Sequence, residues 1–142
     1  MDLPIPFGWY AVAYSKDLNP GDVEPLNFFD QHMVLFRTED GEAKILEAYC
    51  PHLGAHLGYG GKVEGQGITC PFHGWAFNGD GVCTSVPYAK TMPRRIQDTN
   101  CLYSYPLREC NRMIWAWYHP RRVDPIWELD SLCILLLISA AF

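Results

Sequence analysis

The sequence predicts an all-β domain, and three observations support this. Aromatic residues make up 14% of the 142 residues, and aromatic and β-branched side chains favour strands. The 12 glycines and 11 prolines supply the tight turns that join short strands. No segment keeps a 3.6-residue apolar period long enough to predict a helix. A chain of this length forms one domain with a buried core, so we expect an antiparallel β sandwich or barrel.

Strands are expected in the first half wherever short apolar stretches alternate with turn residues. These stretches are Trp9–Tyr14, Val23–Phe28, His32–Arg37 and Ala43–Ala48. Asn19–Asp22 is a turn cluster, and Asp40 with Gly41 supplies the positive φ of a hairpin turn within Glu39–Glu42. We therefore expect the first half to fold as a meander.

The second half is expected to complete the sheet. Leu102–Leu107 and Met113–Tyr118 are predicted strands, with Glu109–Arg112 as the turn between them. Between Cys50 and Gly81 the composition changes, because nine glycines crowd this stretch and indicate a specified backbone shape. We expect a Gly-rich loop insertion there that carries a site.

Charge and the two ends of the chain exclude some classes of function. A formal net charge of −5 argues against nucleic-acid binding, which needs a basic surface. Residues 1–6 show no secretion signal, so a cytoplasmic location is expected, where cysteines stay reduced. The apolar run Leu132–Phe142 falls short of the roughly 20 residues of a membrane-spanning helix, so no span is expected.

Two short motifs carry the chemistry. Cys50-Pro51-His52 and Cys70-Pro71-Phe72-His73 each offer one thiolate and one imidazole, and 17 residues separate His52 from Cys70. Zinc sites usually group the two cysteines at one end and the two histidines at the other. A [2Fe–2S] cluster with two Cys on one iron and two His on the other suits mixed arms. A structural zinc ion, and buried thiols with unrelated histidines, remain as alternatives.

The order Cys-x-His, then Cys-x-x-His, with Gly54 and Gly74 after the ligand pairs, resembles the Rieske iron–sulfur family. The resemblance implies a Rieske domain that binds a Rieske-type [2Fe–2S] cluster in two loops at about residues 49–81. It also implies a ligand set, which is Cys50, His52, Cys70 and His73.

The branch of the family is partly legible. The cytochrome bc type carries a disulfide and a serine hydroxyl near the cluster, where this chain has Ala55, Phe72 and Trp75. With fewer hydrogen bonds to stabilise the reduced cluster, a lower reduction potential is expected.

Three strings, Phe7–Tyr10, Cys50–Gly58 and Cys70–Trp75, are similar to the N-terminal domain of Rieske non-haem iron oxygenases. The similarity is greatest to the steroid-acting subgroup that includes 3-ketosteroid 9α-hydroxylase, and Leu53 departs from the Arg of many aromatic-ring dioxygenases. We expect residues 1–128 to form the Rieske domain. Residues 129–142 are expected to be an atypical apolar tail left by truncation or frameshift of a longer oxygenase, with a genuine C-terminal strand as the alternative.

The resemblance implies a function as an electron carrier within an oxygenase component. A reductase or ferredoxin would donate electrons. A mononuclear iron held by two His and one carboxylate, which in intact family members lies in a neighbouring subunit of a trimer, would receive them. Downstream of His73 the sequence has one further histidine, His119, so no such iron site or catalytic residue is predicted here. A stand-alone Rieske-type ferredoxin is the alternative, and a structural zinc domain is the third hypothesis.

Several further residues are expected around the cluster. Gly54 and Gly74 would let backbone N–H groups approach the sulfides, and His56 is a candidate for a hydrogen-bond donor beside the ligands. Trp75 and Phe72 would either shield the cluster from water or fill space beneath the loop. Each ligand imidazole is expected to point its outer N–H at a carboxylate or carbonyl. Ordinary core or surface roles are expected for His32, His119, Cys83, Cys101, Cys110 and Cys133.

Overall fold

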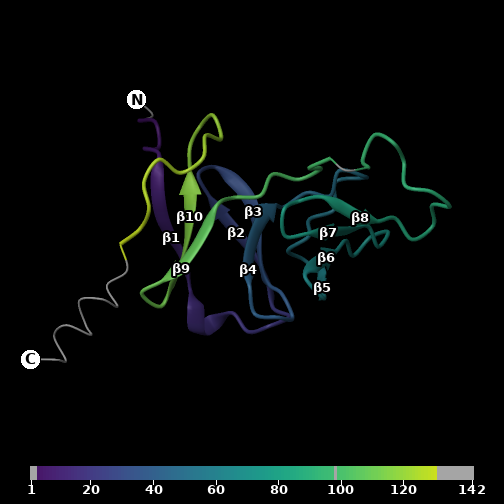
Figure 1. Cartoon of the computed structure of the whole chain (residues 1–142), viewed down its shortest axis with the longest axis horizontal. Helices are drawn as coiled ribbons and strands as arrows, with labels where there is room; N and C mark the ends of the chain where they lie inside the picture. The colour runs from purple at the N-terminus through teal and green to yellow at the C-terminus, as the bar shows by residue number, and fades with distance from the viewer. Residues whose placement is uncertain (1–2, 98, 131–142) are drawn as a thin grey trace, which may run out of the picture.

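The computed structural model describes residues 3–97 and 99–130 and confirms the all-β fold (Figure 1). Its strands are β1 (Gly8–Tyr14), β2 (Val23–Phe28), β3 (Gln31–Arg37), β4 (Ala43–Glu47), β5 (Lys62–Glu64), β6 (Gly67–Thr69), β7 (Ala76–Asn78), β8 (Cys83–Ser85), β9 (Leu107–Cys110) and β10 (Met113–Tyr118). In the described part of the chain, the one helical element is the 3₁₀ turn η1 (Ser15–Asp17).

The strands form three antiparallel sheets, ordered β1-β10-β9, β2-β3-β4 and β5-β6-β7-β8. Figure 1 shows the first two sheets at one end of the molecule and the third, with its long loops, at the other end. Side chains from the first two sheets meet in one core, which includes Val12, Met33, Leu35, Ile45, Ile114 and Ala116. The two sheets therefore form the sandwich, and the third belongs to a separate loop-rich subdomain.

Strand β3 joins the two parts because it is buried on both faces. Alternate side chains of a strand point to opposite sides. Met33 and Leu35 enter the sandwich core, whereas Val34 and Phe36 enter a second core with the loop-rich subdomain. All four side chains are fully buried. Burial on both faces explains why this strand is a continuous apolar run, and it fixes the subdomain against the sandwich.

Two predicted turns form as expected. Gly21 and Gly41 adopt positive φ values of 89° and 97°, which glycine tolerates without strain. The amide of Gly41 donates to the carbonyl of Thr38 at 3.0 Å, and the turn joins β3 to β4.

The predicted meander of the first half is wrong for its first strand. β2, β3 and β4 do follow one another as neighbours, but β1 pairs with β10, from the other end of the described chain. Local turn signals cannot reveal this pairing, because it depends on the aromatic face that β1 and β10 share, where Trp9 contacts Trp117 at 5.5 Å between ring centroids.

The predicted strand Leu102–Leu107 is also wrong, since β9 begins at Leu107. Residues 102–105 run beside β4 through one isolated bridge, between Leu46 and Ser104. Pro106 has no N–H to donate and interrupts the ladder before β9. The turn that follows is shorter than predicted: Cys110 pairs with Met113, and only Asn111 and Arg112 turn the chain, both with positive φ.

No helix among the described residues has the length and apolar character needed to cross a membrane. The predicted apolar tail Leu132–Phe142, with Cys133, lies outside the described residues.

Candidate metal centre

Two loops of the subdomain present the predicted ligands, and their backbones close in the same way. In the first loop, the amide of Gly54 donates to the carbonyl of Cys50 at 2.9 Å, and the amide of Cys50 donates to Ala55 at 2.9 Å. In the second, Gly74 donates to Cys70 at 3.1 Å, and Cys70 donates to Trp75 at 2.7 Å. The two loops, residues 50–55 and 70–75, therefore close with the same pattern of hydrogen bonds.

The glycines in these loops are required by backbone conformation. Gly54 has a φ of 77° and Gly74 a φ of 73°, a region that costs other residues about 1–2 kcal/mol. A Cβ at Gly54 would meet nothing within 4 Å, so conformation alone selects glycine there. At Gly74 a Cβ would also press on Pro87 at 3.3 Å.

The two thiols lie together at the base of the loops. Cys50 and Cys70 are 2% and 4% exposed, and they interact with one another. Burial, and to a lesser extent the neighbouring Cys70, raises the pKa of Cys50 to about 11. The backbone N–H groups of His52 and Leu53 donate to the Cys50 sulfur and partly oppose this rise in pKa. A bound metal would remove both thiol protons, because coordination stabilises the thiolate.

The two imidazoles form the second pair. The rings of His52 and His73 lie 4.7 Å apart, centroid to centroid, at an interplanar angle of 74°. Nδ1 of His73 is buried and has no hydrogen-bond partner among the described residues. A buried polar nitrogen without a partner is rare and costly, and a metal ion would satisfy it. The residues present therefore fit a metal centre.

The predicted ligands lie in two pairs of like kind, thiol with thiol and imidazole with imidazole. A [2Fe–2S] cluster of mixed ligation takes two protein ligands on each iron, so two pairs match its demand.

Of the other predicted site residues, Trp75 and Phe72 contact the two histidines of the motifs, whereas His56 does not. Trp75 is 8% exposed and its ring stacks on His52 at 4.7 Å and 11°, so it covers one face of that imidazole. Phe72 touches the ring of His73 at 4.0 Å but is 62% exposed. His56 lies apart, with its ring 5.1 Å from Tyr49, and its Nδ1 accepts the Gly58 amide at 3.0 Å.

His56 also carries a perturbed pKa. Burial, helped by the charge of nearby His32, lowers the pKa of His56 below its ordinary value. The ring therefore stays neutral at pH 7, where it braces the Gly58 turn.

One residue at the site, Tyr88, was not predicted from the sequence. Tyr88 follows β8, and its hydroxyl accepts a hydrogen bond from Nε1 of Trp75 at 2.6 Å. The same oxygen lies 3.4 Å from Nε2 of His52. The outer nitrogen of His52 therefore faces a phenol, not the expected carboxylate or carbonyl. Nothing in the local sequence indicates this, because Tyr88 lies 36 positions after His52 in the chain.

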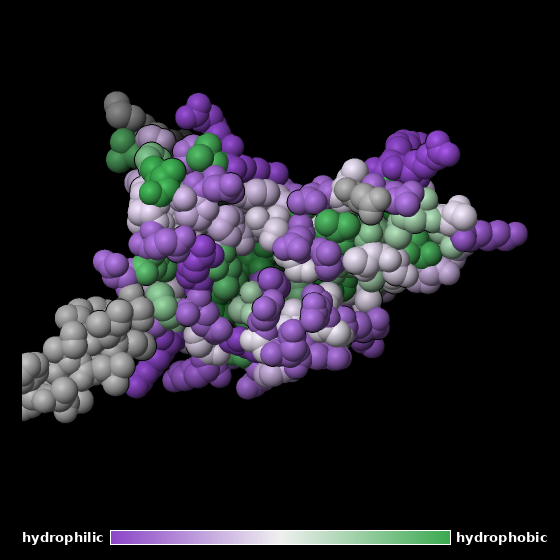
Figure 2. Space-filling view, viewed as in Figure 1, coloured by the Kyte–Doolittle hydropathy of each residue, from purple (hydrophilic) through white to green (hydrophobic). Residues whose placement is uncertain are grey.

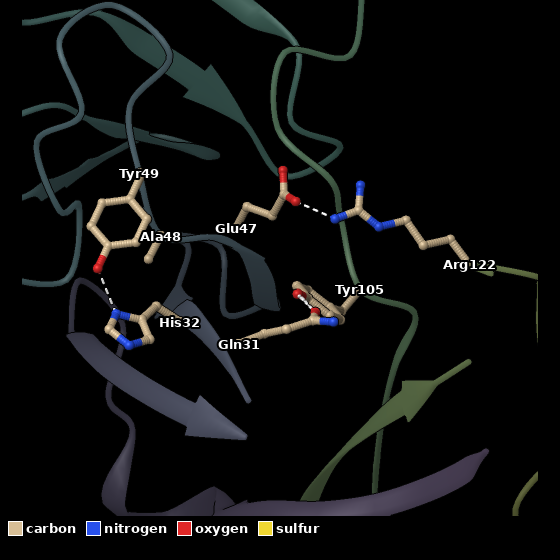
Figure 3. Close-up of a pocket in the computed structure, with 7 residues that line it drawn as sticks. All are labelled: Gln31, His32, Glu47, Ala48, Tyr49, Tyr105 and Arg122. Carbon is tan, nitrogen blue, oxygen red and sulfur yellow. Dashed lines mark hydrogen bonds and ion pairs between the residues drawn. The ribbon is translucent and has the colours of Figure 1, made fainter. Parts of the chain in front are cut away.

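A cavity of about 430 Å³ lies at the start of the first ligand loop, where Tyr49 lines it together with residues of β3, β4 and the segment after β10 (Figure 3). Its polar side chains satisfy one another, in three pairs: Tyr49 with His32, Glu47 with Arg122, and Tyr105 with Gln31. Burial raises the pKa of Tyr105 to about 12, which keeps its hydroxyl a donor. The Glu47–Arg122 pair fastens the segment after β10 to β4, and the other two pairs join Tyr49 and Tyr105 to β3.

A scan against protein families matches residues 8–106 to the Rieske [2Fe-2S] domain. The chain belongs to this family. The Rieske domain carries a Rieske-type [2Fe–2S] cluster, as the sequence predicts.

Relatives of this Rieske domain include sterol and steroid oxidising enzymes. Cholesterol 7-desaturase nvd 1 of Ciona intestinalis is 40% identical over 133 residues, which cover 92% of this chain and 27% of the relative. A probable 3-ketosteroid-9-alpha-monooxygenase, oxygenase component, of Rhodococcus rhodochrous is 34% identical over 122 residues, or 86% of this chain and 29% of the relative. The expected similarity to the steroid-acting subgroup is confirmed.

Solved structures agree with the sequence relatives. Apo dicamba monooxygenase superposes with a TM-score of 0.70 at 28% identity, covering 90% of this chain and 38% of its own. The reduced complex between oxygenase and ferredoxin in carbazole 1,9a-dioxygenase gives 0.68 at 26% identity, covering 86% and 33%. The Rieske domain described here thus spans between a quarter and two fifths of the length of these proteins.

Proposed function

We propose that this chain is the electron-transfer domain of an oxygenase component. In this proposal Cys50 and Cys70 hold one iron of the cluster, and His52 and His73 hold the other. The pairing of like ligands, presented by two loops of matching geometry, carries the proposal. We assign the domain to residues 1–128 and leave 129–142 as a tail.

The chain's own residues hold and tune the site. The cluster, when bound, takes up and releases one electron at a time. The backbone N–H groups of His52 and Leu53 point at the sulfur of Cys50 and stabilise negative charge there. Burial of both cysteines and of Trp75 keeps water from the thiolate side.

The imidazole side is where we expect electrons to enter and leave. Large apolar side chains beside the two histidines are exposed to solvent: Leu53 by 64%, Phe72 by 62% and Tyr88 by 59%. Apolar side chains of this size at a surface are typical of a contact with another protein. The acceptor that we propose is a mononuclear iron held by residues beyond these 142, in the same or a neighbouring subunit. The relatives' names suggest a sterol or steroid as the eventual substrate.

The electron donor that we propose is a reductase or an acidic ferredoxin. Although the chain carries a net charge of −5, residues 81–97 contain Lys90, Arg94 and Arg95 and no Asp or Glu. All three cations are exposed, on the loop that also carries Tyr88. Figure 2 shows hydrophilic protrusions next to apolar surface at the end of the molecule beyond β8. Such a local basic surface would attract an acidic carrier.

Spectroscopy of the purified chain tests the proposal. We expect two iron and two sulfide per chain, visible absorbance that bleaches on reduction with dithionite, and a rhombic EPR signal in the reduced state. Nitrogen couplings from two histidines in pulsed EPR would identify the mixed ligation. A colourless, EPR-silent protein with one zinc per chain would overturn the proposal and favour a structural zinc domain.

A further inference from the structure

Tyr88 lies where it touches both the proposed ligand His52 and the ring that covers it. Its hydroxyl oxygen is 2.6 Å from Nε1 of Trp75 and 3.4 Å from Nε2 of His52. The indole ring of Trp75 is stacked on the imidazole of His52. His52 is therefore held on one face by Trp75 and met at its outer nitrogen by Tyr88.

The position of Tyr88 is itself fixed. Trp75 is tied into the second ligand loop, because its carbonyl accepts the amide of Cys70 at 2.7 Å. Pro87, next to Tyr88, lies against Gly74 of the same loop. The loop after β8 thus packs on the second ligand loop, and from there the Tyr88 side chain reaches across to the first.

Counting donors and acceptors decides the roles. The indole N–H is a donor only, so the Tyr88 oxygen must accept from Trp75. An imidazole that binds a metal through Nδ1 carries its proton on Nε2, and that N–H then points at the same oxygen. A phenol oxygen has two lone pairs and accepts both bonds. Its own hydrogen can turn to solvent, because Tyr88 is 59% exposed.

We propose that Tyr88 is a positioning residue for His52, whose outer N–H it accepts so as to fix the ring's tautomer and to lower the reduction potential of the cluster. The proposal rests on the ligand role of His52 proposed above. An acceptor at the outer N–H makes an imidazole a more basic ligand, and a more basic ligand stabilises the oxidised iron.

Tyr88→Phe tests this directly, because it removes the hydroxyl and keeps the ring. We expect the cluster to load normally. At a fixed solution potential, the ratio of reduced to oxidised cluster should rise about threefold. At 59 mV per tenfold, this corresponds to a positive shift of about 28 mV in the reduction potential. We also expect a changed coupling for one of the two histidine nitrogens in pulsed EPR. A purely structural role for Tyr88 would leave both readouts where they are in the unmodified chain.

Tyr59→Phe is the matched control. Tyr59 is 69% exposed and its ring contacts His56, so its hydroxyl should not affect the potential. Trp75→Phe is a second variant that removes the N–H holding the Tyr88 hydroxyl, and we expect a smaller shift in the same direction. If Tyr88→Phe did not load its cluster, Trp75→Phe would test the same network.

The outcomes separate this inference from the proposed function. An unmodified chain without a cluster would overturn the proposed function. A loaded cluster with an unchanged potential and unchanged nitrogen couplings in Tyr88→Phe would overturn the role of Tyr88 alone. An equal shift in Tyr59→Phe would also overturn it, since the effect would then come from any lost surface hydroxyl.

Discussion

Arg37 and Glu109, 72 residues apart, form a two-bond ion pair across the sandwich. The Arg37 guanidinium donates to Glu109 at 3.0 Å and 2.6 Å, one bond to each carboxylate oxygen. It also donates to the carbonyls of Leu18 and Gly41, at 2.6 Å and 2.8 Å. Arg37 ends β3 and Glu109 lies in β9, so one side chain ties both sheets to the two adjoining turns.

Glu109→Gln should destabilise the protein and change its response to acid. At pH 7 the free energy of unfolding is expected to fall by about 2 kcal/mol, which is typical of hydrogen bonds to charged groups. The Arg37 side chain is largely buried, whereas the Glu109 carboxylate is one third exposed. The Arg37 hydrogen bond holds the pKa of Glu109 below its ordinary value of 4.5, although burial opposes this. The stabilisation is therefore full above about pH 4.5 and is lost as pH falls through the lower folded value. Urea unfolding at pH 7 and pH 4 measures both effects.

Glu128→Gln is the control for this pair. Glu128 also binds an arginine through two bonds, to Arg108, but both side chains are about half exposed or more. Exposed pairs contribute about 0–1 kcal/mol, so this variant should unfold nearly as the unmodified chain does. Equal losses for the two variants would contradict the assigned importance of Arg37.

Replacing His73 and replacing His56 should have opposite outcomes for the cluster. His73→Ala removes the buried imidazole whose Nδ1 has no partner in the described structure, and we expect cluster content to fall to roughly a tenth or less. His56→Ala should keep iron and sulfide near normal, because that ring braces Gly58 and lies beside Tyr49. Iron and acid-labile sulfide per chain measure both. Cluster loss in His56→Ala with normal content in His73→Ala would refute the ligand assignment.

The candidate site could be proposed from the sequence because the predicted ligands lie in short local motifs, and their assignment as ligands stays a prediction. Cys50 and His52 are two residues apart, so any backbone that closes the loop at Gly54 presents both to the same centre. The partners of those ligands were not predictable. Tyr88 reaches His52 through a loop whose path depends on how Pro87 packs against Gly74.

The strands β1 to β4 and β10 were predictable from the sequence, but the pairing of β1 with β10 was not. The short apolar stretch of β3 predicted the strand, yet only the tertiary structure shows that both of its faces are buried. His56 illustrates the same limit, since a histidine four residues from a ligand points wherever its loop directs it. Pro106 marks the break before β9, but the sequence reading placed a strand across it.

Two glycine substitutions should separate the cost of conformation from the cost of space. Gly54→Ala meets no neighbour within 4 Å, so only its φ of 77° is strained, and we expect a loss of about 1–2 kcal/mol. A Cβ at Gly81, where φ is 81°, would lie 1.9 Å from the carbonyl oxygen of Leu102, which is backbone and cannot step aside cheaply. Gly81→Ala should therefore cost more than about 3 kcal/mol or prevent folding. Urea midpoints rank the two, and a milder effect at Gly81 would contradict the packing of residues 100–102 against Gly81 and Val82.

Reversing charge on the loop that carries Tyr88 should slow electron entry. Arg94→Glu with Arg95→Glu should lower the second-order rate of reduction by an acidic plant-type ferredoxin about tenfold at low ionic strength, because attraction becomes repulsion. The control is Lys16→Glu with Arg121→Glu, which changes the net charge equally. Lys16 lies in η1 of the sandwich and Arg121 follows β10, so both are on the other part of the molecule.

Stopped-flow reduction at several salt concentrations measures the rates. The difference in rate between the two double variants should shrink toward high salt. Salt screens the attraction between the proteins, with a screening length of about 10 Å at 0.1 M. Equal slowing by both variants would mean that net charge, and not this loop, governs approach of the donor.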